Sequence, residues 1–302
     1  MKAIVLHEYG GPNKLKYEDV DDPTPGQGEV LVLLAATSVN PVDYKMRSGE
    51  IQAYMPVQFP GILGRDVAGV IRQLGPGVTG FAEGDRVMAL SKKTYAQLVV
   101  VKASDLAIIP PDLDIVQAAA LPLVTLTGEQ LITRAAKVEK GQTILIAGAV
   151  GAVGRSAVLT AQKAGAIVIA GVRKKQMDEA KELRVADVLA LDDEKAMAKL
   201  GYIDVVADTV GHETAEKLIA KVRQDGVFAT VLGPPANARM HPTVRIESVH
   251  AEPDAKTLRI LAEDSLAKRL TIPIDRMVPL ADAADAHAAA EKGGLGKILL
   301  MA

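Results

Sequence analysis

The sequence predicts an α/β protein that joins a β-rich part to a doubly wound parallel sheet. From residue 141 onward, short apolar runs alternate with amphipathic segments, as strands and helices do when helices cover both faces of a parallel sheet. In the first third, short apolar runs alternate with Pro and Gly punctuation, as at 23–26 and 75–77. A chain of 302 residues is long enough for two domains.

The elements of the first part follow from apolar runs between turn residues. Strands are predicted at 3–6, 29–36, 66–74, 86–90 and 96–101. The segment 110–120 combines a Pro-Pro-Asp turn with apolar residues at helical spacing. We expect the crossover into a second domain there.

The second part predicts a regular alternation of strands and helices. Strands are expected at 143–147, 167–171, 187–191, 203–208 and 227–232, with helices at 152–164, 175–184, 193–199 and 213–223. An edge strand at 244–250, a helix at 254–269, a strand at 272–280, an Ala-rich helix at 281–290 and a strand at 297–301 complete the pattern. Because the tail returns to strands, we expect one domain from 1–118 with 252–302 and another from 119–251.

The stretch 143–154 predicts a dinucleotide-binding turn. An apolar run ends at the first of three glycines, and an amphipathic segment follows the third. The glycines would allow a sharp turn, close approach of a pyrophosphate and tight packing of the helix, whose first N–H groups then face the anion. A turn that only connects two elements is the alternative, and the further strand at 167–171 favours the nucleotide. The residues expected to bind are Gly148, Ala149, Val150, Gly151, Ala152, Val153 and Gly154.

The end of the second strand predicts NADPH rather than NADH. NAD sites place an acid about twenty residues after the glycine turn, where it binds the ribose 2′-hydroxyl. Here Gly171 and Val172 are followed by Arg173, Lys174 and Lys175. These cations offer charge-assisted donors to a 2′-phosphate. A solvated basic face on the next helix is the alternative.

Composition excludes several classes of function. The formal net charge of -2 and the scarcity of aromatic residues argue against nucleic acid as a partner. No uncharged apolar run has the length of a membrane span, and the chain enters a strand pattern without a signal segment, so we expect a cytoplasmic protein. The absence of Cys excludes disulfides, thiolate zinc sites and cysteine nucleophiles.

Several sequence blocks together resemble the medium-chain dehydrogenase/reductase superfamily. They are Ser38-Val-Asn-Pro-Val-Asp-Tyr-Lys45, Pro60-Gly-Ile-Leu-Gly-Arg-Asp-Val-Ala-Gly-Val70, Gly84-Asp-Arg-Val87, Ala119-Ala-Leu-Pro122 and the glycine turn. Within that superfamily the chain is similar to the zinc-free quinone oxidoreductases, and its block 40–45 to enone and 2-alkenal reductases. The resemblance implies a GroES-like β-barrel catalytic domain, a Rossmann domain, NADPH as hydride donor and a homodimer.

The resemblance also implies catalysis without zinc. Zinc-dependent relatives place a Cys where this chain has Asn40, and a His-Glu pair where it has Arg65 and Asp66. Without zinc there is no Lewis acid to stabilise an alkoxide, so we expect acceptors whose hydride adduct is already a stabilised anion. Quinones and α,β-unsaturated carbonyls meet that condition.

The block 40–45 supplies the candidate catalytic residues, and we expect it to form a loop after a strand. Asn40 could donate its amide N–H to the substrate oxygen, and Tyr44 or Lys45 could stabilise an enolate or supply a proton through water. Alternatively, Asn40 only shapes a turn, Lys45 is solvated and Asp43 pairs with a cation such as Arg65. The tyrosine of many quinone reductases falls where this chain has Lys45, which leaves the proton donor open.

Further cofactor contacts are expected around the sheet. Thr127 matches a threonine that lies beside the nicotinamide in the family, with a helix-terminal hydroxyl as the alternative. The ends of the fourth and fifth strands should flank the ribose and nicotinamide, because ligands bind beyond the carboxyl ends of parallel strands. Lys297 resembles a family segment that returns to the cofactor, or is a surface residue. The strand-end residues are Asp208, Thr209, Val210, Val231, Leu232 and Gly233.

The sequence thus predicts an NADPH-dependent, zinc-free reductase of quinones or activated enones and enals. The alternatives are a reductase of quinones alone and a non-catalytic NADPH-binding protein. The segment 244–250 could join two copies through an exposed sheet edge, or its charges could blunt that edge in a monomer. The histidines show no ligand spacing and are expected to be non-catalytic, namely His7, His212, His241, His250 and His287.

Overall fold

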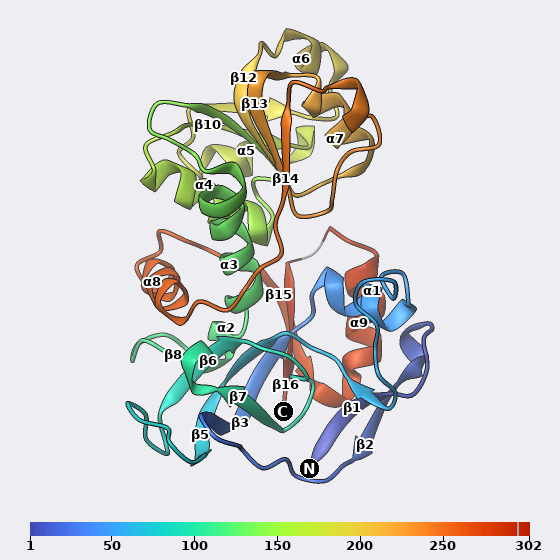
Figure 1. The fold of residues 1–302 in the computed structure, drawn as a ribbon, viewed down its shortest axis with the longest axis vertical. Helices are drawn as coiled ribbons and strands as arrows, with labels where there is room; N and C mark the ends of the chain where they lie inside the picture. The colour runs from blue at the N-terminus through green and yellow to red at the C-terminus, as the bar shows by residue number, and fades with distance from the viewer. Residues whose placement is uncertain (295) are drawn as a thin grey trace. The chain divides into compact units, whose positions relative to one another are not determined.

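The computed structural model describes residues 1–294 and 296–302 and divides into two compact units (Figure 1). Unit 1 comprises Met1–Leu123, Pro253–Lys268 and Ile272–Ala302, and unit 2 comprises Val124–Glu252 and Arg269–Thr271. The sequence places the domain limits after residues 118 and 251. These limits stay predictions, because the compact units are defined by contacts within the structure.

Unit 1 is built on two sheets, one of seven strands and one of three. The larger has the order β15-β16-β3-β5-β6-β8, with β7 paired to β3, and the smaller has the order β2-β1-β4. The strands are β1 (Lys2–Leu6), β2 (Leu15–Asp19), β3 (Glu29–Ser38), β4 (Gly61–Ile62), β5 (Asp66–Leu74), β6 (Arg86–Leu90), β7 (Leu98–Lys102), β8 (Ala107–Ile108), β15 (Ile274–Pro279) and β16 (Lys297–Met301).

The long strand β3 organises this unit. Its alternate residues Val30, Val32 and Leu34 point into a core shared with β5, β6 and β7, as period-two patterning requires. Its end pairs antiparallel with β16, where Ser38 stands opposite Leu299. The C-terminal strand therefore lies beside the start of the block 40–45.

The helices of unit 1 include one that the sequence did not predict. They are α1 (Pro41–Ser48), α2 (Ile115–Ala118), α8 (Ala255–Leu266) and α9 (Ala283–Glu291), with 3-10 turns at Pro12–Lys14, Ala103–Asp105 and Leu280–Asp282. The expectation of a loop at 40–45 is wrong, because Asn40 caps a helix that starts at Pro41. Helix α9 packs its Ala283 and Ala286 into the core that contains β1 and β16.

Unit 2 is a six-stranded parallel sheet of the order β11-β10-β9-β12-β13-β14. The chain builds outward from β9 on one side and then crosses to the other, so β9 and β12 mark the point where the order reverses. The strands are β9 (Thr143–Ala147), β10 (Ile167–Val172), β11 (Asp187–Ala190), β12 (Ile203–Asp208), β13 (Val222–Thr230) and β14 (Arg245–Ser248).

Helices cover both faces of this sheet, as the alternation of strands and helices predicts. Ile144 and Ile146 of β9 pack with α4 and α5, while Leu145 and Ala147 pack with α6 and α7 on the opposite face (Figure 1). The helices are α3 (Pro122–Gln130), which begins in unit 1, α4 (Ala152–Lys163), α5 (Met177–Lys181), α6 (Glu194–Lys199) and α7 (His212–Ile219), with a π-helical turn at Leu131–Ala136 and 3-10 turns at Lys174–Gln176 and Ala238–Met240.

Two details of unit 2 bear on the sequence predictions. The helix expected at 213–223 ends at Ile219, because Val222 is buried as the first residue of β13. The edge strand expected at 244–250 is confirmed as β14, which pairs with β13 at the end of the sheet.

Candidate functional site

The carboxyl ends of four neighbouring strands in unit 2 gather most of the predicted cofactor residues. Ala147 of β9 stands opposite Gly171 of β10 and Asp208 of β12, and Asp208 stands opposite Thr230 of β13. In an open parallel sheet, ligands bind outside these ends, at the point where the strand order reverses. Residues 148–154, 171–175, 208–210 and 231–233 all end or follow these strands.

The glycine turn after β9 has the form of a phosphate cradle. Gly148 has φ +77°, and a Cβ there would lie 2.5 Å from Oγ1 of Thr209. A Cβ on Gly154 would collide with the carbonyl oxygen of Gly148, whereas one on Gly151 would approach that oxygen only to 3.2 Å. Close packing thus requires glycine at positions 148 and 154, whereas Gly151 leaves space for a ligand to approach the backbone.

The first turn of α4 is available to an anion. Gly151 is its N-cap, and among the described residues no side chain caps the helix. The N–H groups of a first helical turn have no intrahelical acceptor, and the helix dipole adds positive potential at that end. The cradle and the uncapped helix therefore fit the pyrophosphate of a dinucleotide.

Asp208 braces the two loops beside this cradle. Its Oδ1 accepts the N–H groups of Val210 (3.0 Å) and Gly211 (2.9 Å), and its Oδ2 accepts the hydroxyl of Thr230 (3.1 Å). Thr230 Oγ1 in turn accepts the N–H of Leu232 (3.0 Å). The carboxylate is fully buried, whereas the apolar side chains of Val210 and Leu232 are exposed. Exposed apolar residues at a strand-end crevice suit contact with a ligand.

The basic run after β10 lies on the surface next to two acids. Arg173, Lys174 and Lys175 are exposed. The backbone N–H of Lys174 donates to Oδ1 of Asp192 (2.7 Å), and its Nζ lies 3.6 Å from Oδ2 of Asp193. The two acids follow β11, and their sequence positions gave no sign of this contact. They offset part of the positive charge of the run.

Two predicted cofactor residues lie outside this strand-end group. Thr127 is half-buried on α3. Lys297 belongs to β16 in unit 1, where its side chain is buried. The alternative that Lys297 is a surface residue is therefore wrong.

In unit 1, the block 40–45 begins with a capping box. The backbone N–H of Asn40 donates to Oδ2 of Asp43 (2.9 Å), three residues into α1, and Pro41 occupies the first helical position. Both Asn40 and Asp43 are buried. The local sequence thus builds a helix start at the end of β3.

The carboxamide of Asn40 is engaged at both ends. Nδ2 donates to Oδ2 of Asp66 (2.7 Å) and lies 3.3 Å from the carbonyl oxygen of Ser38, and Oδ1 accepts from Nζ of Lys297 (2.6 Å). Asp66 also accepts the Ser38 hydroxyl and, at 2.7 Å, the N–H of Leu123. Donation from Asn40 to a substrate stays a prediction, and it requires one of these internal contacts to be exchanged.

Asp43 is a buried carboxyl with an unusual environment. Burial raises its pKa to about 6, opposing the N–H of Asn40 that favours the charged form. Oδ2 also accepts the hydroxyl of Tyr95 (3.1 Å), and Oδ1 has no hydrogen-bond partner among the described residues. The alternative that Asp43 pairs with Arg65 is therefore wrong.

A chain of hydrogen bonds runs from Asp43 to α9. Tyr95 donates to Asp43, so its oxygen is left to accept from Nε2 of His287, 3.0 Å away. Nη1 of Arg47 lies 3.4 Å from Nδ1 of His287, and Nη2 donates to Glu291 (2.5 Å). Because guanidinium only donates, the network assigns His287 as neutral with its proton on Nε2. Burial, with the charge of Arg47, lowers the pKa of His287 to about 3.

The other two candidate catalytic residues lie on α1 and are half-buried. Tyr44 has its pKa raised, chiefly by burial and then by the charge of Glu291. Nζ of Lys45 lies 2.9 Å from Oε1 of Glu50. Lys45 is therefore not simply solvated, because its ammonium forms an ion pair with Glu50. The donors of both side chains lie outside the buried polar cluster, which consists of Asn40, Asp43, Asp66 and Lys297.

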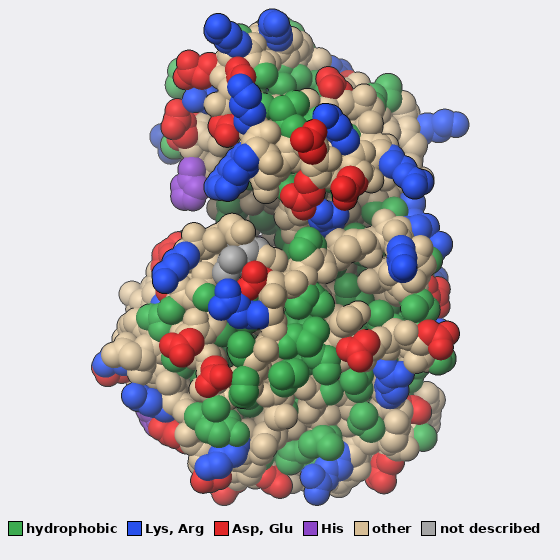
Figure 2. All heavy atoms as spheres, turned by 180° about the vertical axis from the view of Figure 1, so that it is seen from behind, with side chains coloured by type: hydrophobic (Ala, Val, Ile, Leu, Met, Phe, Trp, Pro, Cys, Tyr) green, Lys and Arg blue, Asp and Glu red, His purple; other side chains and the backbone are tan. Residues whose placement is uncertain are grey.

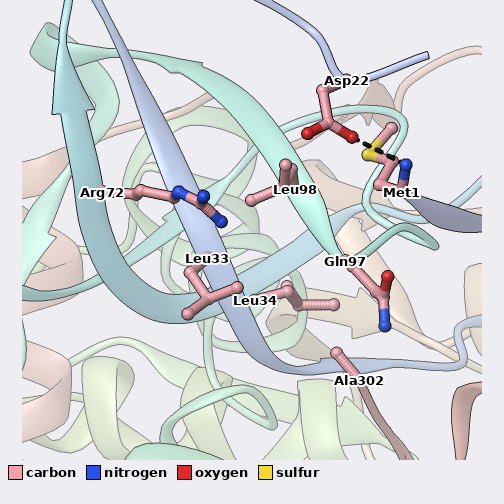
Figure 3. A pocket seen from close by; sticks show the side chains of 8 residues that line it. All are labelled: Met1, Asp22, Leu33, Leu34, Arg72, Gln97, Leu98 and Ala302. Carbon is pink, nitrogen blue, oxygen red and sulfur yellow. Dashed lines mark hydrogen bonds and ion pairs between the residues drawn. The ribbon is translucent and has the colours of Figure 1, made fainter.

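A separate hollow of about 450 Å³ lies elsewhere in unit 1 (Figure 3). Leu33 and Leu98 form its apolar wall, Arg72 points across it, and Asp22 pairs with the amino group of Met1 at 2.7 Å. It contains none of the predicted site residues, so we do not assign the reaction to it.

Figure 2 shows how charged side chains of the described residues are distributed on one face of the molecule. On the face drawn in Figure 2, Lys and Arg side chains of the described residues alternate with Asp and Glu instead of forming one basic patch. In the described part of the chain, no helix is both long and apolar enough to cross a membrane. The same residues include no cluster of three His, Asp or Glu side chains placed to hold a metal ion.

Comparison with known proteins places the chain in a family. The family model of the alcohol dehydrogenase GroES-like domain matches residues 26–111, and that of the zinc-binding dehydrogenases matches residues 183–300. The 2-haloacrylate reductase of a Burkholderia species is 31% identical over 75% of this chain and 72% of its own length. The chain belongs to the medium-chain dehydrogenase/reductase superfamily.

Two chloroplastic oxidoreductases are also similar to this chain. The chloroplastic quinone-oxidoreductase homolog of Spinacia oleracea is 35% identical over 63% of this chain, and the match spans only 60% of that relative's length. The chloroplastic NADPH-dependent alkenal/one oxidoreductase of Arabidopsis thaliana is 31% identical over 77% of this chain and 63% of its own length.

Solved structures match over the whole chain. The quinone oxidoreductase from Coxiella burnetii is 27% identical with a TM-score of 0.88, covering 100% of this chain and 99% of its own. A mycobacterial protein solved in complex with NADPH is 26% identical with a TM-score of 0.85, covering 100% of both chains. The predicted fold, a GroES-like domain with a Rossmann domain, is thereby confirmed.

The sequence did not predict the network of side chains that extends from Asp43. Tyr95 and His287 come from distant parts of the chain, Arg47 follows the block 40–45 on α1, and nothing in their local sequence indicates a shared network. Asp66 was noted only for standing where zinc relatives have a ligand. A buried strand that begins with a charged residue, as β5 does with Asp66, is the one signal that could have pointed to the cluster.

Proposed function

We propose that the protein is an NADPH-dependent, zinc-independent reductase of quinones or α,β-unsaturated carbonyls. The observation that carries the proposal is the cradle of unit 2, in which Gly148, Gly151 and the uncapped start of α4 fit a dinucleotide pyrophosphate. NADPH supplies a hydride when bound. The part of the protein is then to orient the reactants and to stabilise negative charge on the acceptor oxygen.

The choice of NADPH is supported by the end of β10. Gly171 leaves no carboxylate to repel a 2′-phosphate, and the exposed Arg173, Lys174 and Lys175 offer donors to it. Asp192 and Asp193 reduce this advantage without removing it, since Asp192 is engaged by a backbone N–H. The NADPH named for two of the similar proteins supports the same cofactor.

The class of acceptor is supported by the donor chemistry of unit 1. The chain has no Cys, and Asn40 and Asp66 are hydrogen-bonded to each other where zinc-dependent relatives have ligands, so we expect no catalytic zinc site of that kind. Quinones and enones place the charge of the hydride adduct on a phenolate or enolate oxygen, which side-chain donors can stabilise. Tyr44 and Lys45, which are partly exposed on α1, are the donors that we assign to this role, whereas Asn40 is buried.

One assay tests the function. NADPH oxidation is followed by its near-ultraviolet absorbance with a naphthoquinone, with a 2-alkenal and without acceptor. Oxidation with both acceptors supports the proposal, and oxidation with the naphthoquinone alone makes the protein a strict quinone reductase. NADPH binding without oxidation by either acceptor would show a non-catalytic cofactor-binding protein and contradict it.

We further propose a homodimer that pairs the two copies of β14. This strand closes the sheet of unit 2, and such an edge offers unpaired N–H and C=O groups. An antiparallel contact about a two-fold axis would satisfy those groups in both copies. Sedimentation equilibrium at micromolar concentration tests it, since a single species near the 31.8 kDa chain mass would rule out the dimer.

A further inference from the structure

Lys297 is a lysine buried inside unit 1. Its side chain leaves the first residue of β16 and donates to the carbonyl oxygen of Val39 (3.1 Å) and to Oδ1 of Asn40 (2.6 Å). Its Nζ also lies 3.8 Å from Oδ2 of Asp66. Removing an ammonium from water costs free energy unless it is hydrogen-bonded and paired with an opposite charge. The fold therefore depends on these contacts of Lys297.

The contact of Lys297 with Asn40 fixes one end of the carboxamide. An amide has one acceptor end and one donor end, and the two can exchange places by a half turn. Because the ammonium of Lys297 only donates, it can bind only the oxygen end of Asn40, which leaves Nδ2 facing Asp66 at 2.7 Å. The carboxylate of Asp66 only accepts and requires the same orientation, so the ammonium and the carboxylate hold the two ends of the amide together.

The same ammonium balances charge in the cluster. Two carboxyls interact with its charge, Asp66 on β5 at 3.8 Å and Asp43 on α1, and Oδ2 of Asp43 also accepts the hydroxyl of Tyr95. Two carboxyls thus share one buried ammonium. Removing it leaves them uncompensated in a medium where charge interactions are poorly screened.

We propose that Lys297 is a positioning residue that holds Asn40 and Asp66 in one arrangement and so fixes the start of the helix α1. The capping box of Asn40 and Asp43 transmits this order to the first turn of α1, which carries Tyr44 and Lys45. This inference rests on the proposed function, because those two residues are the donors assigned to the acceptor oxygen. It gives Lys297 a different role from the cofactor contact expected from the sequence.

Because the chain contains no cysteine, the side chain can be rebuilt chemically at this one position. Lys297→Cys is alkylated in the unfolded state with bromoethylamine, which restores an ammonium at nearly the length of lysine, or with iodoacetamide, which adds a neutral amide. Both products are refolded and compared by circular dichroism. Lys292→Cys, an exposed position beyond α9, is treated in the same two ways as the matched control.

We expect kcat to fall when the side chain at position 297 is neutral and to recover only when an ammonium is restored there. The neutral product at 297 should lose about 10²-fold in kcat with naphthoquinone, because misplacing a donor by about an ångström costs that much. Its Kd for NADPH, read from nicotinamide fluorescence, should stay unchanged, whereas a cofactor contact would raise it. The aminoethylated product should regain most of the kcat. Equal kcat for the two products, or a loss confined to NADPH affinity, overturns the proposal.

A second readout is independent of activity. The carboxyl of Asp43 is titrated by carbon-13 NMR in protein labelled at aspartate, using wild type, Lys297→Met and Lys292→Met. The charge of Lys297 lowers the pKa of Asp43, so this pKa should rise above about 6 in Lys297→Met and stay in place in Lys292→Met. If wild type reduces no acceptor, the proposed function fails while this titration still decides whether Lys297 orders the cluster. An unchanged Asp43 titration in a folded Lys297→Met overturns it, and if that variant does not fold, the two alkylated Lys297→Cys products are titrated instead.

Discussion

The hydroxyl of Thr230 donates to Oδ2 of Asp208 across 3.1 Å and joins the carboxyl ends of the neighbouring strands β12 and β13. Oγ1 of Thr230 also accepts the N–H of Leu232, so the hydroxyl proton is committed to the carboxylate. The pair therefore sets the path of both loops that leave β12 and β13.

Thr230→Val tests this brace. Valine keeps the shape of the side chain but leaves a buried carboxylate oxygen and the N–H of Leu232 without their partner. The free energy of unfolding should fall by about 1–3 kcal/mol, the cost of unsatisfied buried polar groups. NADPH affinity should fall with it, because the loops carrying Val210 and Leu232 shift. Urea unfolding and nicotinamide fluorescence measure the two effects. Thr243→Val, at an exposed position, is the control. Equal changes in unfolding free energy and NADPH affinity in the two variants would contradict the role given to Thr230.

The basic run after β10 predicts selectivity for the phosphorylated cofactor. Replacing Arg173 and Lys174 by Ala should weaken NADPH binding by about 1.5–3 kcal/mol for each charge-assisted hydrogen bond removed, and should leave NADH binding nearly unchanged. Titration of both cofactors by nicotinamide fluorescence measures this. Lys195→Ala, an exposed cation on α6, controls for general charge. Equal affinities of wild type for NADH and NADPH would remove the basis of the prediction.

Activity should not depend on a metal ion. The sequence has no Cys, and Asn40 and Asp66 bind each other and Lys297 where a metal would need free ligands. Dialysis against a chelator should leave the rate of NADPH oxidation unchanged, and added zinc should not increase it. Loss of activity on dialysis followed by recovery with zinc would contradict the proposal.

The sequence predicts the strand β9, the glycine turn and the helix α4 well because this feature is local. A strand, a glycine turn and a helix lie within about one βαβ unit, and their periodicity and glycine spacing are legible without the rest of the chain. The polar cluster of unit 1 could not be predicted in this way. Lys297 and Asn40 are 257 residues apart, and Arg47 and His287 are 240 apart. The pairing of β16 with β3 brings the first two residues together, and the packing of α9 against α1 brings the second two together.

The helix α1 shows a second limit of local reading. The sequence Asn-Pro suggested a turn, and the same two residues are also a good N-cap and first helical residue. Asp43, three residues on, completes a capping box, and this decides between a loop and a helix. Its burial, which gives it an unusual pKa, depends on Tyr95 and α9 and is not visible in the block itself.

Asp43 and His287 should make opposite contributions to the pH dependence of stability. The pKa of Asp43 rises from 3.8 to about 6 on folding, so its contribution to stability is present below 3.8 and is lost as pH rises toward 6. The pKa of His287 falls from 6.5 to about 3, so its contribution is present above 6.5 and is lost as pH falls toward 3. Between pH 4 and 6 folding therefore takes up one proton at Asp43 and releases one at His287.

These two slopes, each about 1.4 kcal/mol per pH unit, should cancel in the wild type over that range. Asp43→Asn removes the falling slope, so the free energy of unfolding should rise with pH by about 1.4 kcal/mol per unit relative to wild type. His287→Gln removes the rising slope and should give the reverse. Urea unfolding at pH 4, 5 and 6 measures both, with the exposed Asp21→Asn as control. The hydrogen bonds that each variant lacks displace its curve by a constant and leave its slope intact. Parallel curves for all four proteins would therefore show that neither group is perturbed by folding.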